Sequence, residues 1–117
     1  MAVETLRQKQ SRFVRYVARL IGFATDSGYE LTFGECWRTP EQAQWNADHG
    51  LGIANSLHIS RLAIDLNLFK DGIMLTSVDA FAPLGIYWKN LATDCSWGGD
   101  FSKPDVYHFS IQHNGVR

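Results

Sequence analysis

The chain has 117 residues, enough for one domain with a single hydrophobic core. Apolar residues make up 45% of it and aromatic residues 13%, which excludes a disordered protein. The net charge of −1 argues against a dedicated nucleic-acid-binding protein, which would usually be basic. No apolar run approaches the ~20 residues of a membrane span. Arginines interrupt every apolar segment near the N-terminus, so we expect a protein made in the cytoplasm without a signal peptide.

Positive charge is concentrated in the first twenty residues, where only Glu4 opposes it. The basic residues there are Arg7, Lys9, Arg12, Arg15 and Arg19. Such charges are commonly the solvated face of a helix. They would also attract an anionic polymer or surface, so two interpretations stay open. Cys36 and Cys95 are too few for a disulfide framework, and we expect both thiols to be reduced and structural.

Hydrophobic periodicity in the first half of the chain predicts two helices and a strand. Apolar residues at three- and four-residue spacing predict a helix over residues 3–24, which Asp26-Ser27-Gly28 ends. Alternating apolar residues predict a strand over residues 29–37. Thr39 as N-cap and Pro40 at the first helical position then begin a helix that runs to about His49.

The strongest strand pattern follows a glycine-containing loop at residues 50–55. Four apolar residues of the stretch 61–69 face one way, namely Leu62, Ile64, Leu66 and Leu68. Ala63, Asp65 and Asn67 face the other way. Lys70-Asp71-Gly72 predicts a tight turn into a partner strand at residues 73–75. We further expect a helix over 78–91, a loop over 97–100 and a last strand over 106–112. The chain is therefore predicted to be an α+β domain with a small antiparallel sheet on which the N-terminal helices pack.

Two stretches carry candidate chemistry. His58 lies just before the predicted strand and Asp65 lies within it, while Asp105 lies just outside the last predicted strand and His108 lies within it. Two imidazoles and a carboxylate could hold a zinc ion and leave one coordination position open, with a second carboxylate as base. Each residue also has an ordinary interpretation: Asp65 on an exposed sheet face, and His58 as a structural histidine. The odd spacings require bends, one between His58 and Arg61 and one beside Asp105. His49 and His113 are weaker candidates, which we expect at the surface.

These residues form a pattern that resembles a known family. Ser56-x-His58-x(6)-Asp65, with Ala63 before the aspartate, and the later Asp105-x-x-His108 resemble the motifs of zinc peptidases that cut peptidoglycan stem peptides. These are the D-alanyl-D-alanine carboxypeptidases and L-alanyl-D-glutamate endopeptidases. Arg38-Thr39 with Gln42, and the stretch Trp97-Gly98-Gly99-Asp100-Phe101, resemble further family segments. The similarity covers residues 29–111. Arg61 or Leu62 stands where the family has glycine, and Asp105 replaces the glutamate of many members.

The resemblance implies roles for individual residues. His58, Asp65 and His108 would be the zinc ligands, on the polar face of the sheet. Asp105 would be the catalytic base, and Arg38 would stabilise the oxyanion or hold a substrate carboxylate. Ser56 would hydrogen-bond substrate or a ligand carboxylate, and Gln42 would be either a structural or a substrate-pocket residue. Trp97 lies in a predicted glycine-containing loop, and we expect it to line the substrate cleft. Residues 1–28 would form an N-terminal helix and residues 29–112 the catalytic core.

The resemblance predicts a phage or prophage endolysin that hydrolyses the L-Ala–D-Glu bond of the stem peptide with zinc. Such a protein would be made in the cytoplasm and act on the bacterial cell wall after release, and we expect a monomer. A D-Ala-D-Ala carboxypeptidase is the second interpretation. A zinc-containing domain that binds muropeptides without catalysis is the third, and the presence of Asp105 argues against it.

Overall fold

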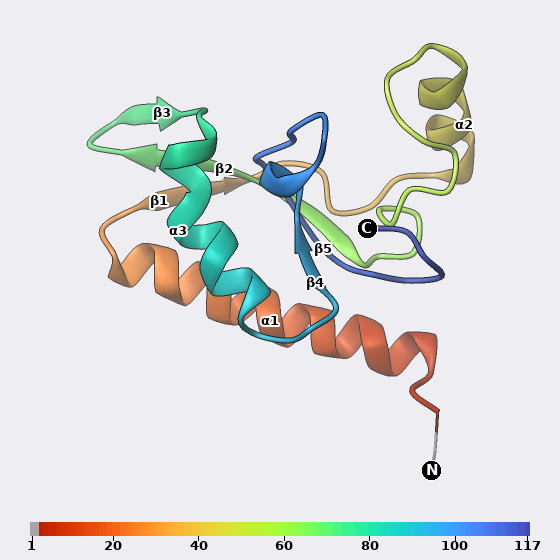
Figure 1. The fold of residues 1–117 in the computed structure, drawn as a ribbon, viewed down its shortest axis with the longest axis horizontal. Coiled ribbons are helices and arrows are strands. Elements are labelled where there is room, and N and C mark those ends of the chain that lie inside the picture. Colours follow the sequence, from red (N-terminus) through yellow and green to blue (C-terminus); the bar gives the residue numbers. More distant parts are fainter. Residues whose placement is uncertain (1–2) are drawn as a thin grey trace.

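The sheet is assembled from strands in both halves of the chain; α1 precedes all of them in sequence, and the other helices lie between them (Figure 1). The computed structural model describes residues 3–117. The elements are α1 (Leu6–Asp26), β1 (Glu30–Phe33), α2 (Pro40–Asp48), β2 (Ala63–Lys70), β3 (Ile73–Leu75), α3 (Val78–Lys89), β4 (Cys95–Trp97), the 3₁₀ helix η1 (Gly98–Asp100) and β5 (His108–Ile111). Helices with a small antiparallel sheet make the fold α+β, as the sequence predicts.

β2 is the strand around which the sheet is built. β1 pairs with one of its edges, β3 and β5 pair with the other, and β4 lies outside β5, all antiparallel. The predicted apolar row is buried: Leu62, Leu66 and Leu68 are fully enclosed and Ile64 nearly so. This burial fixes the register, since a slip by one residue would turn the leucines toward solvent. In that register, Asp65 stands opposite His108.

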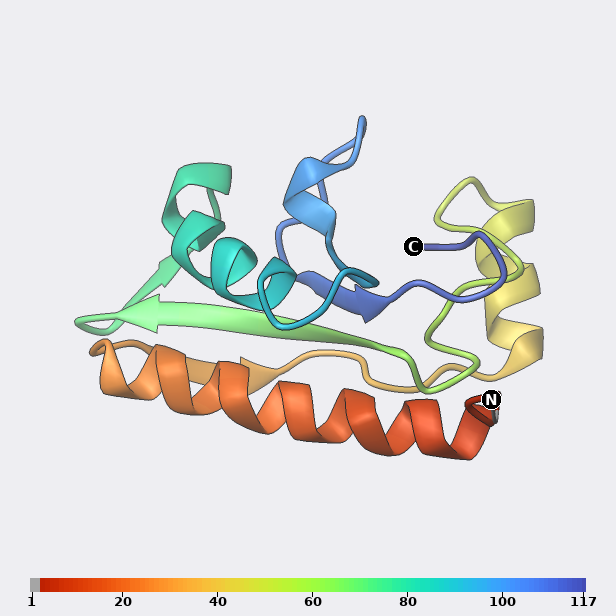
Figure 2. The ribbon, with the colours of Figure 1, turned by 60° about the horizontal axis from the view of Figure 1, so that its bottom comes forward.

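α1 supports the sheet along its length. Figure 2 shows it running below β2, whereas α2, α3 and η1 lie on the upper side of the picture. The helix begins later than predicted because Thr5 is its N-cap and forms a capping box with Gln8. Phe13 and Leu20 are buried from its apolar stripe. No helix within residues 3–117 combines the length and the apolar character needed to cross a membrane.

Part of the basic charge of α1 has a structural use. Arg12 forms ion pairs with Glu4 at 3.0 Å and with Asp94 at 2.7 Å, which ties α1 to the segment before β4. Arg7, Arg15 and Arg19 remain exposed. The solvated-face interpretation therefore fits these three arginines, while Arg12 joins two parts of the fold.

The C-terminal half departs from prediction in two places. The expected loop at residues 97–100 is instead the end of β4 followed by η1. The last strand is shorter than predicted, and all of its residues, His108–Ile111, are buried. They are covered because β4 pairs with β5 while Trp88 of α3 packs edge-on against Phe109. Trp88 also donates its indole N–H to the Ser110 carbonyl at 3.0 Å, which satisfies a buried donor.

Candidate metal centre and cleft

His58 reaches the site because the chain turns sharply between β2 and the preceding loop. Backbone N–H groups of Ile59 and Ser60 donate to the carbonyls of Ser56 and Leu57. Arg61 takes a left-handed conformation, with φ of 56°, at the last position of this bend. The bend predicted between His58 and Arg61 is therefore present, and it uses a non-glycine residue in a conformation that costs free energy. It turns the imidazole toward β2.

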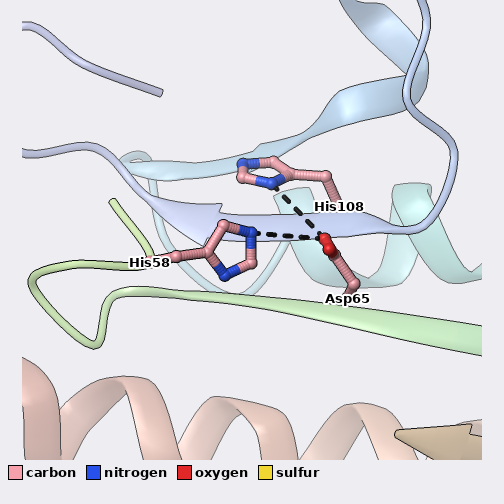
Figure 3. A group of neighbouring side chains, drawn as sticks. All are labelled: His58, Asp65 and His108. Atoms are coloured by element: carbon pink, nitrogen blue, oxygen red, sulfur yellow. Dashed lines mark ion pairs between the residues drawn. The ribbon is translucent and has the colours of Figure 1, made fainter. Parts of the chain in front are cut away.

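Three side chains meet above the sheet. Figure 3 shows both imidazoles directed at the Asp65 carboxylate, His58 from the turn and His108 from β5. His58 Nε2 lies 3.4 Å and His108 Nδ1 lies 3.7 Å from Asp65 Oδ1. Both histidines are buried, and Asp65 is partly buried. The structure thus brings together the three residues that the sequence pattern nominates as ligands.

The chemistry of this group fits a metal ion. One potential ligand atom from each residue lies within 4.8 Å of the others. Two ligand atoms about 2.0–2.1 Å from a tetrahedral zinc ion lie about 3.3 Å apart, close to the separations found here. Asp65 Oδ1 is buried and makes no hydrogen bond to any described residue. Such a group is costly unless a cation or hydrogen-bond donor completes it, so a bound metal would satisfy it.

The pKa values of the two aspartates at the site, Asp65 and Asp105, are shifted in opposite directions. Burial alone would raise the pKa of Asp65, but the attraction between its carboxylate and the nearby His108 and His58 rings outweighs burial and holds that pKa well below the usual range. Burial and then repulsion from Asp65 raise the pKa of Asp105. Asp65 is thus held as an anion, whereas the Asp105 carboxylate binds a proton more readily than a free side chain.

The segment after β1 closes the other side of the group. The Gly34 N–H donates to the Asp65 carbonyl at 2.8 Å, and the Asp65 N–H donates to the Glu35 carbonyl at 2.8 Å. A side chain at Gly34 would begin 2.9 Å from Asp65 Cβ, which is why glycine is needed at this close approach. Farther along, the Arg38 N–H donates to the His58 carbonyl at 3.3 Å. The segment 34–38 is therefore hydrogen-bonded through its backbone to both stretches that carry candidate ligands, at Asp65 and at His58.

The group opens into a cleft of about 630 Å³. Its lining includes the three central side chains and residues from the loops around them: Arg38, Leu51, Ile53, Ser56, Phe101, Lys103, Asp105 and Arg117. The Ser56 hydroxyl accepts a hydrogen bond from the His58 N–H at 3.2 Å, which supports the turn as well as facing the cleft. A volume of this size accommodates a short peptide beside the candidate ligands.

Two residues that we predicted at the substrate site lie elsewhere. Gln42 is exposed on α2, does not line the cleft, and donates its side-chain N–H to Asn46 at 2.7 Å. Trp97 is only 4% exposed, so its predicted place in the cleft wall is wrong. The predicted exposure assumed that glycine neighbours make an open loop. Instead, Gly85 and Gly99 leave flat surfaces against which the indole packs.

Trp97 nevertheless supports the site from below. Its indole N–H donates to the Val106 carbonyl at 2.9 Å. Gly98, the next residue, accepts a hydrogen bond from the Asp105 N–H at 2.9 Å. The tryptophan-glycine stretch is therefore a platform for the backbone that carries Asp105.

Some residues around the cleft had no functional assignment from the sequence. Glu35 Oε1 lies 2.6 Å from Arg38 Nη2 and 3.7 Å from His58 Nδ1. Lys103 and Arg117 add positive charge to the cleft wall. An acid three residues before Arg38 was the available signal for Glu35, but its partner His58 lies in a distant segment. No pattern in the sequence linked the C-terminal Arg117 to this cleft.

Two buried imidazoles and a carboxylate, with a second carboxylate in an open cleft, define a candidate metallohydrolase site. A protein-family model described as D-alanyl-D-alanine carboxypeptidase matches residues 43–111, more than half of the chain. The chain therefore belongs to this family.

A solved structure shares the fold. The L-Ala D-Glu endopeptidase ChiX of Serratia marcescens is similar to this chain with a TM-score of 0.73 and 19% sequence identity. The match covers 93% of this chain and 84% of that chain. A search of curated proteins finds no match. At 19% identity, the structural similarity supports the shared fold and leaves the activity of this chain to be argued from its own residues.

Proposed function

We propose that this protein is a zinc-dependent peptidase of peptidoglycan stem peptides and that it cleaves the L-Ala–D-Glu bond. The observation that carries the proposal is the buried His58, Asp65 and His108 group opening into a cleft that also contains Asp105. The family match supports a peptidase that acts on peptidoglycan. The endopeptidase specificity is suggested by the name of the structural neighbour.

The residues divide the chemistry among themselves. A zinc ion held by His58, Asp65 and His108 would supply Lewis-acid polarisation of the scissile carbonyl and lower the pKa of water to about 7. Asp105 would accept the proton of the attacking water on its carboxylate and deliver it to the leaving amine. Its raised pKa favours this exchange in both directions. Such general acid–base catalysis contributes on the order of 10²–10⁴ in rate.

The cationic residues of the cleft would orient the substrate. The Arg38 guanidinium can donate to a carbonyl oxygen or, in a bidentate way, to a substrate carboxylate. Lys103 and Arg117 suit the carboxylates of an acidic stem peptide. Ser56 would contact substrate from the turn that carries His58.

We extend the proposal to the place of action. The protein would be made in the cytoplasm as a phage or prophage endolysin, and it would act as a monomer on the bacterial cell wall after release. The exposed Arg7, Arg15 and Arg19 of α1 would add attraction to anionic wall polymers.

Carboxypeptidase activity is a second candidate, because the matched family model is described as D-alanyl-D-alanine carboxypeptidase. A D-Ala-D-Ala carboxypeptidase would use the same residues but release terminal D-Ala. Mass spectrometry of fragments released from purified peptidoglycan, with and without a zinc chelator, separates these activities. Chelator-sensitive release that leaves a new D-Glu amino terminus supports the endopeptidase. Release of D-Ala alone identifies the carboxypeptidase, and no release from zinc-loaded protein favours a binding domain without catalysis.

A further inference from the structure

The imidazole of His58 stands between two carboxylates. Its Nε2 faces Asp65 Oδ1 at 3.4 Å, and its Nδ1 faces Glu35 Oε1 at 3.7 Å. The His58 side chain is only 4% exposed, so water has little access to either ring nitrogen. Nδ1 is buried and has no hydrogen-bond partner among residues 3–117. Glu35 is therefore the group nearest to satisfying it.

Glu35 has acceptor capacity left for this purpose. Its Oε1 lies 2.6 Å from Arg38 Nη2 in an ion pair. The guanidinium N–H bonds are not directed at this buried oxygen, so Glu35 Oε1 accepts no hydrogen bond from Arg38. Its backbone carbonyl accepts from the Asp65 N–H at 2.8 Å, which fixes the residue beside β2. A separation of 3.7 Å is longer than a hydrogen bond. A small rotation of the partly exposed Glu35 side chain would close it.

We propose that Glu35 is a positioning residue for His58, and this inference rests on the proposed zinc-dependent function. Its carboxylate accepts a hydrogen bond from His58 Nδ1–H. A neutral imidazole carries a proton on only one nitrogen, so Nε2 then presents its lone pair toward Asp65 and the metal position. A carboxylate behind a ligand histidine also raises the basicity of the ligand nitrogen.

The same carboxylate connects two functions of the site. Glu35 contacts Arg38, which faces substrate, and His58, which faces the metal position. Loss of its charge should therefore weaken metal binding through His58 and free the Arg38 guanidinium at the same time. The effect on metal binding separates this role from a simple ion pair with Arg38, which would leave zinc affinity unchanged.

The first test is zinc affinity, measured by competition with a chelator of known affinity. Glu35→Gln should weaken zinc binding by about 10–100-fold, the usual effect of removing such a partner. Glu30→Gln, an exposed residue on β1, makes the same chemical change away from the site and should leave affinity unchanged. Arg38→Gln should also bind zinc normally, and Glu35→Gln should retain its effect in that background. Equal zinc affinity of folded Glu35→Gln and wild type would overturn the proposal.

The second test reads the proton directly and needs no metal. Long-range ¹H–¹⁵N correlation spectra of the metal-free protein at a pH where His58 is neutral should show its proton on Nδ1, and Glu35→Gln should mix the two tautomers. A proton on Nε2 in the wild type would refute the inference. If the wild type binds no zinc, the proposed function fails, and this spectrum alone decides the role of Glu35. If zinc binds normally but no peptidoglycan is cleaved, the proposed function fails while the zinc comparison still tests Glu35.

Discussion

Gly98 lies directly beneath Asp105, and replacing it with alanine should displace the proposed catalytic base. The Gly98 carbonyl accepts the Asp105 N–H, so the two backbones are already in contact. A Cβ added at Gly98 would lie 2.1 Å from the Asp105 carbonyl oxygen and 2.9 Å from His108 Cβ. The nearer neighbour is backbone and cannot rotate out of the way. The segment that carries Asp105 must move instead.

The geometry sets the size of the effect. The gap of 2.1 Å must widen to an ordinary contact of 3.4 Å, so the Asp105 backbone shifts by on the order of 1 Å. Overpacking of this kind costs about 1–3 kcal/mol of unfolding free energy. A misplacement of about 1 Å at a catalytic group can reduce the rate by about 10²-fold. We therefore expect Gly98→Ala to lose activity far more than stability would explain.

The assay compares peptidoglycan hydrolysis and urea unfolding of Gly98→Ala with those of Gly22→Ala. Gly22 lies inside α1 with nothing within 4 Å of an added Cβ. That control should keep full activity and gain about 0.5–1 kcal/mol, because alanine is the better helix former. Wild-type hydrolysis and stability in Gly98→Ala would refute the close packing of Gly98 against Asp105.

Three further outcomes follow from the site. Asp105→Asn should reduce hydrolysis by about 10²–10⁴-fold and retain zinc; loss of zinc from this variant would instead make Asp105 a ligand. In the wild type, kcat/KM should fall as pH drops through the raised pKa of Asp105. In metal-free protein, Asp65→Asn should lower the free energy of unfolding, measured with urea, more at pH 6 than at pH 3. The pKa of Asp65 is lower in the folded state than in the unfolded state, so the stabilisation from its carboxylate is lost as pH falls toward the folded pKa. An equal loss of unfolding free energy at both pH values would contradict this. Trp97→Phe leaves the Val106 carbonyl without its donor and should cost about 1–3 kcal/mol, whereas Trp45→Phe on exposed α2 should be close to neutral.

The elements that could be predicted are those whose signal is local. β2 follows from the strict alternation of Leu62 to Leu68, because a strand with one buried face must repeat every two residues. α2 follows from Thr39 and Pro40, and the Thr39 hydroxyl does accept the Gln42 N–H at 3.0 Å. β4 was missed because its three residues are too few for a periodic pattern, and its burial depends on β5 and α3, which pack against it.

The site could be predicted only as a set of residue types. The family resemblance nominates His58 and Asp65 as ligands, but their convergence depends on a left-handed Arg61, a conformation that glycine usually takes. Trp97 was misplaced because its indole packs against Gly99 of its own stretch and against Gly85 of α3, and no local pattern links these two segments. Glu35 was missed for the same reason: its partner is brought near by the fold and not by the sequence.

The division between sheet and loops has a consequence for engineering. His108 and Asp65 project from paired strands in the hydrophobic core, whereas much of the cleft wall comes from exposed loops at residues 50–53 and 101–104. Within these two loops, Phe101 is half-buried and every other residue is exposed. Their sequences can therefore be shuffled in a library while the reactive centre stays constant, and selection on walls with different peptide cross-links becomes a direct route to new target ranges.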